Sequence, residues 1–329
     1  MSSTTFDLIE GGRSAPLEPL TGTEIAARSP LELFWRRFRK DRIALVSLGF
    51  IVFLVVVAIA APLVVKLLGA AGPDVQNPGA LTQFGTPTGP SFAHHHIFGV
   101  DPLGRDVFSR VVYGARVSLE VAFIATGLSM MIGIGVGMVA GLYRGWVDTL
   151  LSRMIDLTLC FPVLLLGLGL GAACSQGNGC AGGTIKPGTD VVILVIVLAT
   201  WTYIARIVRG QVLSLREKEF VQAARSLGAS EARIIFREVL PNLTASIIVV
   251  ATLFIPINIL TEAALSFLGV GVQPPNPSWG GMLADATNIF NSAWWYMVFP
   301  GAALLLTVLA FNLVGDGLQD ALQPRAAHT

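Results

Sequence analysis

The sequence predicts an all-α, polytopic membrane protein with six transmembrane helices. Of its 329 residues, 53% are apolar and only 13% are charged, with a mean hydropathy of +0.69. Soluble proteins carry about 25% charged residues, so this balance excludes an ordinary aqueous domain. The apolar residues also form runs of the length, about 20 residues, that a helix needs to cross a bilayer. The net charge of +1 gives no basic surplus for a nucleic-acid partner.

The N-terminal part is expected to approach the bilayer without crossing it. Residues 1–30 contain no apolar core of signal-peptide length, which predicts a flexible tail that is not cleaved. Residues 31–42 place Phe34, Trp35 and Phe38 at helical spacing among basic residues, which indicates an amphipathic helix at the lipid surface. The alternative is a plain basic flank without a docked helix, and it puts these residues on the same side of the membrane.

Six nearly uncharged runs are the expected spans. They are residues 43–65, 117–142, 151–172, 191–208, 245–270 and 297–318. The fourth run is short, and it spans only if Tyr203 sits in the interface and the helix continues through Arg206 and Arg209 into water. Pro162 and Pro256 are expected to kink the third and fifth spans.

Basic residues set the orientation, because Lys and Arg concentrate in cytoplasmic loops. They cluster before the first span and in the connection 209–242, so both termini, including the tail 323–329, are expected in the cytoplasm. Residues 66–116 then form a long external connection. Three basic residues oppose this orientation: Arg105, Arg110 and Arg116. Long connections obey the charge rule weakly, so the orientation is kept.

The cysteines and histidines carry little chemistry. Cys160 lies in an apolar stretch and is expected to be a small buried side chain. Cys174 and Cys180 share a short Gly- and Asn-containing loop on the expected outer side, where either a disulfide or two unpaired thiols are consistent with the sequence. The triplet 94–96 of histidines is more typical of a solvated loop than of a metal site, because metal ligands usually come from separate turns. We expect no metal site.

The sequence contains no recognisable catalytic motif. None of its four lysines precedes Ser or Thr, so the phosphate-binding P-loop is absent. It also lacks the H-E-x-x-H and G-x-S-x-G patterns. Six spans with little soluble mass favour transport, and we expect no enzymatic activity, no catalytic residue and no cofactor in this chain.

The connection 209–242 has a definite helical pattern. Phe220, Ala223, Ala224 and Leu227 recur at helical spacing and give a short helix one apolar face. Gly228 then ends this helix, and a second helix follows after a sharp turn. Such a feature suits either docking to a partner or an amphipathic helix resting on lipid headgroups.

Two motifs resemble those of a known family. Residues 222–228, Gln-Ala-Ala-Arg-Ser-Leu-Gly, followed by Leu240-Pro241, resemble the EAA motif of binding-protein-dependent ABC importer permeases. Residues 98–119 resemble the signature of the dipeptide and oligopeptide (peptide/nickel) branch, in its second-type, or C-type, permease subunit. Gln222 stands where the motif has Glu, so a role for that carboxylate does not carry over. The resemblance covers about residues 31–322.

The resemblance implies a type I ABC importer permease fold in the inner membrane, with residues 117–322 as a core of five spans. It implies a second related permease, two identical or different ATPase subunits that use ATP and Mg, and an external protein that delivers a dipeptide or oligopeptide. It also implies that the cytoplasmic loop docks on an ATPase. The docking residues would be Phe220, Gln222, Ala223, Ala224, Arg225, Leu227, Gly228, Leu240 and Pro241.

Polar residues within or near the expected spans allow three interpretations. Asn258, Glu262 and Asn312 are candidates for lining a pathway, for joining helices or for lying near a span end, since polar groups avoid lipid. The same holds for Asp156 and Asp316, for which a place near a span end is favoured. A self-sufficient channel or ion-coupled secondary transporter would need an ionisable site such as Glu262. The docking loop argues against that alternative.

Two further patterns are interpreted as structural. Glycines 133, 137 and 141 have the small-xxx-small spacing that lets two helices pack closely. Residues 104–110 offer Asp106 and Ser109 as capping groups for the helix that leads into the second span, which we prefer to a contact with a binding protein.

Overall fold

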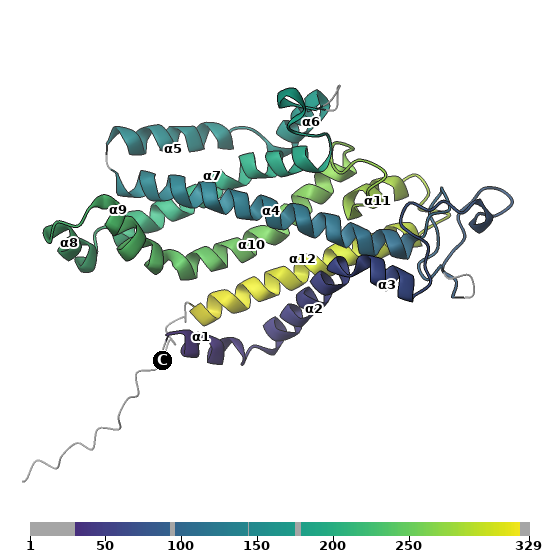
Figure 1. The fold of residues 1–329 in the computed structure, drawn as a ribbon, viewed down its shortest axis with the longest axis horizontal. Coiled ribbons are helices and arrows are strands. Elements are labelled where there is room, and N and C mark those ends of the chain that lie inside the picture. The colour runs from purple at the N-terminus through teal and green to yellow at the C-terminus, as the bar shows by residue number, and fades with distance from the viewer. Residues whose placement is uncertain (1–29, 93–95, 144, 175–178, 323–329) are drawn as a thin grey trace, which may run out of the picture.

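A computed structural model describes residues 30–92, 96–143, 145–174 and 179–322 of the chain. Within these ranges the fold is helical, with isolated β-bridges and no strand. The tails expected for residues 1–30 and 323–329 lie outside the described residues, except for Pro30. The helices form an elongated bundle (Figure 1).

Five helices are long and apolar enough to cross a membrane, and a bent helix pair brings the number of spans to six. The five are α2 (Arg42–Ile59), α4 (Val107–Leu142), α7 (Thr189–Leu215), α10 (Leu240–Phe267) and α12 (Trp295–Leu322). The bent pair is α5 (Trp146–Leu159) and α6 (Val163–Cys174). Shorter helices are α1 (Pro30–Phe38), α3 (Ala61–Leu67), α8 (Glu219–Ser226), α9 (Glu231–Arg233) and α11 (Trp279–Ala286). Single turns are η1 (Pro78–Ala80), η2 (Ala181–Gly183) and the π-helical η3 (Ile234–Val239).

The helix expected over residues 31–42 is α1, which ends at Phe38. Asp41 ends the connection because its carboxylate accepts hydrogen bonds from the N–H groups of Ile43 and Ala44, at 3.0 and 3.1 Å. This is an N-cap, so a new helix, α2, starts at Arg42. The Phe38 side chain packs against the end of α12, which places α1 beside the last helix (Figure 1).

The third expected span, residues 151–172, is not one helix. It is divided into α5 and α6, whose axes differ by 78°. Pro162 lies in the break and has no N–H to donate, and its carbonyl accepts from Leu166 N–H at the start of α6. By contrast, α10 runs through Pro256 without a break in its helical assignment.

The glycine stripe of α4 lies against α7, the helix with which α4 has its most extensive contact. A Cβ atom built on Gly133, Gly137 or Gly141 would fall 2.6–2.7 Å from atoms of α7. No real side chain tolerates that distance, so only glycine allows the two backbones to approach this closely. The predicted packing role of these glycines is confirmed.

The helix expected from residue 117 begins earlier, at Val107, where the Asp106 carboxylate caps it by accepting from Ser109 N–H at 2.8 Å. The capping role predicted for this region is therefore present. With 36 residues α4 is about 54 Å long, which exceeds the hydrocarbon thickness of about 30 Å. Part of α4 therefore extends beyond the bilayer.

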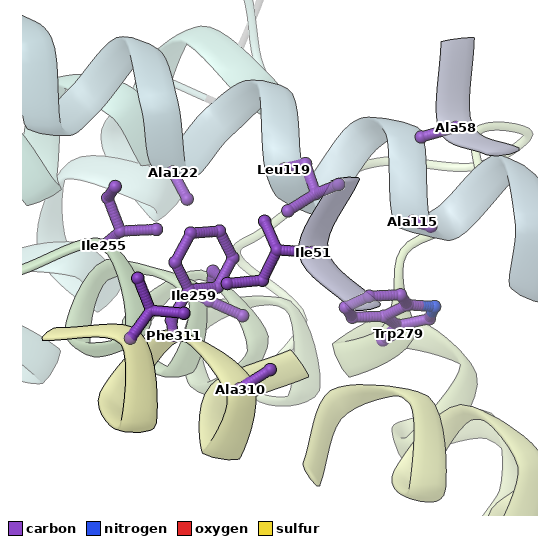
Figure 2. Close-up of a cluster of buried hydrophobic side chains, with 11 residues drawn as sticks. Ile51, Ala58, Ala115, Leu119, Ala122, Ile255, Ile259, Trp279, Ala310 and Phe311 are labelled. Atoms are coloured by element: carbon purple, nitrogen blue, oxygen red, sulfur yellow. The ribbon is translucent and has the colours of Figure 1, made fainter. Parts of the chain in front are cut away.

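A buried apolar cluster joins the helices near α11 (Figure 2). Its labelled residues include Ile51 of α2, Leu119 of α4, Ile259 of α10 and Phe311 of α12, which point toward one another. Trp279 of α11 lies in the same cluster and donates its indole N–H to the carbonyl of Val111, at 3.0 Å. This cluster fixes the end of the bundle opposite α8 (Figure 1).

Candidate functional site

The connection between α7 and α10 contains the predicted helix, turn and second helix. Its helix α8 packs on η3 and is anchored by Val221, which is fully buried in an apolar cluster that also contains residues of η3, α4, α7 and α10. The sequence pattern did not identify this anchor. The predicted apolar face points the other way: Leu227 is 88% exposed and Phe220 is 38% exposed. The structure thus leaves an apolar surface uncovered at the tip of the bundle.

The turn after α8 requires glycine. Gly228 has φ +78°, a left-handed conformation that other residues adopt at a cost of about 1–2 kcal/mol. The N–H of Gly228 donates to the carbonyl of Arg225, and that of Ala229 to the carbonyl of Ala224, both at 3.0 Å. These two hydrogen bonds make a Schellman turn. No atom lies within 4 Å of a Cβ built on Gly228, so its requirement here is conformational.

The second helix is held at a fixed angle to α8. The Ser230 hydroxyl accepts from Arg233 N–H at 3.3 Å and caps α9. An ion pair between Arg225 and Glu231, at 3.2 Å, crosses the turn. Arg216, just before α8, donates to the carbonyl of Gly141 at 2.7 Å and ties the connection to the end of α4. The connection is therefore an ordered part of the bundle.

The predicted docking residues lie together in this region, and most of them face outward. Exposed ones are Phe220, Gln222, Ala223, Arg225, Leu227, Gly228 and Pro241, while Ala224 and Leu240 are half-buried. Pro241 lies in the first turn of α10, where a missing N–H costs nothing. We call Phe220, Ala223 and Leu227 the α8 surface.

Two of the three polar candidates join helices. The amide of Asn258 donates to the hydroxyl of Thr126 in α4, at 2.8 Å, and its carbonyl oxygen accepts from Thr200 in α7, at 3.1 Å. Glu262 is fully buried, and its two oxygens accept from the hydroxyls of Ser118 in α4 and Ser266 in α10, both at 2.7 Å. Neither residue lines an open pathway in this structure.

Asn312 behaves differently. Its side chain is exposed on α12 and donates only to the carbonyl of Val308, four residues earlier in the same helix, at 3.0 Å. The structure therefore does not bring Asn312 together with Asn258 or Glu262.

The loop cysteines lie close together. Cys174 and Cys180 are joined by a disulfide, with their Cα atoms 4.8 Å apart. The third cysteine, Cys160, is an exposed free thiol. The expectation that it is buried was wrong, because it falls in the break between α5 and α6.

A polar network between α3 and α4 was not predicted. Asp101 is fully buried, forms a 2.6 Å ion pair with Arg105 and lies 3.7 Å from Arg110. His96 is buried beside Asp106, at 3.0 Å, so it is not the solvated loop residue that the triplet suggested. His94 and His95 lie outside the described residues. Burial raises the pKa of the Asp106 carboxyl, although hydrogen bonds from Ser109 and His96 oppose the shift.

Comparisons with known proteins place this geometry in a family. The family model for the inner membrane component of binding-protein-dependent transport systems matches residues 133–328. The model for the N-terminal transmembrane domain of oligopeptide transport permease C matches residues 29–81.

Relatives and a solved structure agree with these matches. A dipeptide transport system permease of Alkalihalophilus pseudofirmus is 40% identical, over 94% of this chain and 95% of its own. A glutathione transport system permease of Pectobacterium atrosepticum is 39% identical, over 91% of this chain and 93% of its own. A chain of the MetNI methionine ABC transporter has a similar fold, with a TM-score of 0.54 at 19% identity, over 65% of this chain and 96% of that one.

The fold and its bundle of spans define a multi-pass membrane component of a transport system. The chain belongs to the family of inner membrane components of binding-protein-dependent transport systems. Within that family it is a C-type permease of the peptide ABC transporter branch, as the resemblance predicted.

Proposed function

We propose that this chain is one of two permease subunits in an ATP-driven importer of short peptides. The dipeptide and glutathione permeases that resemble it along nearly their whole length support this cargo class. Dipeptides and glutathione share free charged termini on a short amide backbone. In this proposal a second, related permease completes the pathway, and an external binding protein delivers the cargo.

The α8 surface carries the coupling part of the proposal. An exposed apolar face on a short helix is the usual shape of a helix-in-groove contact, and here it stands on a buried anchor, Val221. Two ATPase subunits, using ATP and Mg, would receive such helices from the two permeases. Closure of the ATPase pair would then move α8 and reorient the spans between two states of access.

The proposal also includes the orientation of this chain in the membrane. The α7–α10 connection carries many basic residues, so the α8 end of the bundle is placed in the cytoplasm. Both termini then face the cytoplasm as well. Glu262 gives no support to the ion-coupled alternative, because hydroxyl groups occupy both of its oxygens and no surface of it is open to water.

A variant of Gly228 tests the coupling role. Gly228→Leu strains the left-handed turn and projects a side chain toward the docking partner, so ATP-driven uptake should fall by tenfold or more. Insertion into the membrane should persist, because the new side chain meets no atom of this chain. Gly228→Asn is the control, since Asn tolerates left-handed backbone and should retain most of the uptake. Normal uptake by Gly228→Leu would refute the coupling role.

Cross-linking tests the contact directly. A bifunctional reagent attached at Leu227→Cys, in a background with Cys160→Ser, should capture an ATPase subunit in the assembled transporter. The matched control is Leu103→Cys, which lies at the opposite end of the bundle and is 48% exposed. Capture from Leu103 and never from Leu227 would overturn both the docking site and the orientation.

A further inference from the structure

Two hollows lie side by side on the face formed by α5, α7 and α10. The first has a volume of about 440 Å³ and is lined by charged side chains of α5 and α7, including Asp156 and Arg206. The second has a volume of about 390 Å³, lies at the break between α5 and α6, and is lined in part by Thr158 and Tyr203. Thr158 follows Asp156 by two residues, and Tyr203 precedes Arg206 by one helical turn, so the hollows are adjacent.

Ion pairs line the first hollow. Arg209 holds Asp148 through two hydrogen bonds of 2.6 and 2.9 Å, and less than a third of each side chain is exposed. Arg206 and Asp156 form a pair at 2.6 Å, yet 57% and 48% of their side chains are exposed. Arg153, 76% exposed, lies 3.9 Å from the other carboxylate oxygen of Asp156 and lines the same hollow. The Arg209 pair is thus a sheltered tie between helices, while the Arg206 pair presents both charges outward.

The exposed pair lies in the half of α7 that leads toward α8. Arg206 lies nine residues before the end of α7 at Leu215, about 13 Å along the helix axis, in the part of the helix that is expected to leave the bilayer for water. Charged side chains inside a span face protein or water, because hydrocarbon does not solvate them. This face of the bundle is therefore covered by another protein chain or filled with water.

The second hollow is lined by apolar side chains interspersed with hydroxyl groups. Hydroxyls of Thr158 and Thr261 donate within their own helices, to the carbonyls of Met154 and Ile257, and so leave acceptor positions toward the hollow. Tyr203 is 53% exposed beside Phe254, with ring centroids 6.5 Å apart. Aromatic faces and hydroxyl groups together accept molecules that are partly polar and partly apolar.

We propose that these two hollows are this chain's half of the cargo pathway, and that Arg206 and Asp156 exchange their mutual ion pair for the two termini of a short zwitterionic peptide. A guanidinium binds a carboxylate with two parallel hydrogen bonds, so Arg206 takes the C-terminal carboxylate and Asp156 takes the ammonium group. The inference rests on the proposed function, since it requires that this chain lines a peptide pathway.

Cysteine labelling tests whether water reaches the face formed by α5, α7 and α10. The whole transporter, with its partner permease, ATPases and binding protein, carries Cys160→Ser and keeps the Cys174–Cys180 disulfide. Tyr203→Cys should react with a charged, water-soluble methanethiosulfonate, and its rate should change at least tenfold between nucleotide-free and vanadate-trapped states. The control is Leu305→Cys, 66% exposed on α12 among apolar residues, which should stay unlabelled. A Tyr203→Cys that stays unlabelled in both states would overturn the pathway assignment.

Peptide chemistry tests the charge exchange. Uptake of dialanine and of its C-terminal amide is measured in proteoliposomes and divided by the ATP hydrolysed, with the same binding protein throughout. Arg206→Gln should lower the ratio of dialanine to amide uptake by about tenfold, the value of one charged hydrogen bond. The double variant Arg206→Asp with Asp156→Arg keeps an ion pair of reversed direction and serves as the structural control.

The outcomes separate this inference from the proposed function. If Arg206→Gln lowers both uptakes equally and the reversed pair restores both, the pair only ties α5 to α7 and the inference is wrong. If the unaltered transporter takes up neither peptide with ATP but does transport a different class of cargo, the peptide function fails first.

Discussion

At the α8 end of the bundle Leu227 stands almost fully in the open, whereas at the opposite end Asp101, Asp106 and Trp279 are completely buried. The two ends are similar in their sequence, since each contains short helices, glycine turns and charged residues. They differ in whether the chain supplies its own contacts. The segment between α3 and α4 closes on α4, α11 and α12, while the α8 surface leaves Leu227 88% exposed and Phe220 38% exposed. The comparison indicates that the end near α11 makes its contacts within this chain, whereas the end at α8 leaves an apolar surface for a partner.

The largest expected effect is a loss of stability at the end of the bundle near α11. Asp101→Ala removes the acceptor of Arg105 Nε and of the N–H groups of Leu103 and Arg105, and it leaves Arg110 without its buried counter-charge. Breaking a buried pair in this way costs about 3–5 kcal/mol, so the unfolding temperature of the purified complex should fall clearly.

Asp74 provides the control for this experiment. It also pairs with Arg110, at 3.6 Å, but its side chain is 49% exposed. Asp74→Ala should therefore cost less than about 1 kcal/mol. Equal losses for the two variants would mean that the segment between α3 and α4 does not depend on the buried network.

The next effect is a loss of affinity for the ATPase subunits at the α8 end of the bundle. Leu227→Asp should leave the stability of this chain within about 0.5 kcal/mol of the original, because 88% of the side chain is already exposed. Its affinity for the ATPase subunits, measured by titration in detergent, should fall at least tenfold, since burying a leucine contributes about 1.5–3 kcal/mol. Leu103→Asp at the other end is the matched control, and if it lowered the affinity as much, the α8 surface would not be the docking site.

A smaller effect concerns the angle between α8 and α9. Arg225 and Glu231 form an exposed ion pair, so Arg225→Gln should cost only about 0.2–1 kcal/mol. A double-mutant cycle with Glu231→Gln, followed by ATPase affinity at low and high salt, measures the coupling between them. The coupling energy should shrink as salt rises, and a value that salt does not change would contradict a solvent-screened pair.

The smallest effect is a pH dependence of the stability at the end of the bundle near α11. Burial raises the pKa of Asp106 above the ordinary 3.8, so in that range the native state holds this proton more tightly than the unfolded state. The Asp106 contribution to stability is therefore fully present below pH 3.8 and declines as pH rises from 3.8 through the raised native pKa. Asp106→Asn should remove this slope from the unfolding temperature measured between pH 4 and pH 7, and an unchanged slope would assign it to another group.

The spans, the turn at Gly228 and the glycine stripe were predictable, because each depends on residues close together in the sequence. Apolar length fixes a span, a glycine between two helical patterns marks a turn, and small residues four apart share one helix face. The turn and the glycine stripe are present in the structure, and five long helices cover five of the six expected spans, whereas the third expected span is a bent pair of helices.

The remaining features depend on distant contacts. Pro162 predicts a bend but not its size of 78°, and it does not reveal which helices the two arms contact: α5 packs against α4 and α7, and α6 packs against α7 and α10. Periodicity found the apolar face of α8 without revealing that it points outward, because one residue, Val221, holds the opposite side. The pairs of Asp101 with Arg105 and Arg110 lie within ten residues of the chain, but Arg110 also reaches back to the carbonyl of Pro73 and to Asp74, and no local pattern shows that closure.

The glycine stripe between α4 and α7 limits how the protein can move. Each glycine of the stripe meets a β-branched residue of α7 (Ile204, Val208 and Val212). Sliding one helix along the other would press side chains into backbone, so we expect α4 and α7 to move together as one unit. A displacement received at the α8 end would then be carried along both helices.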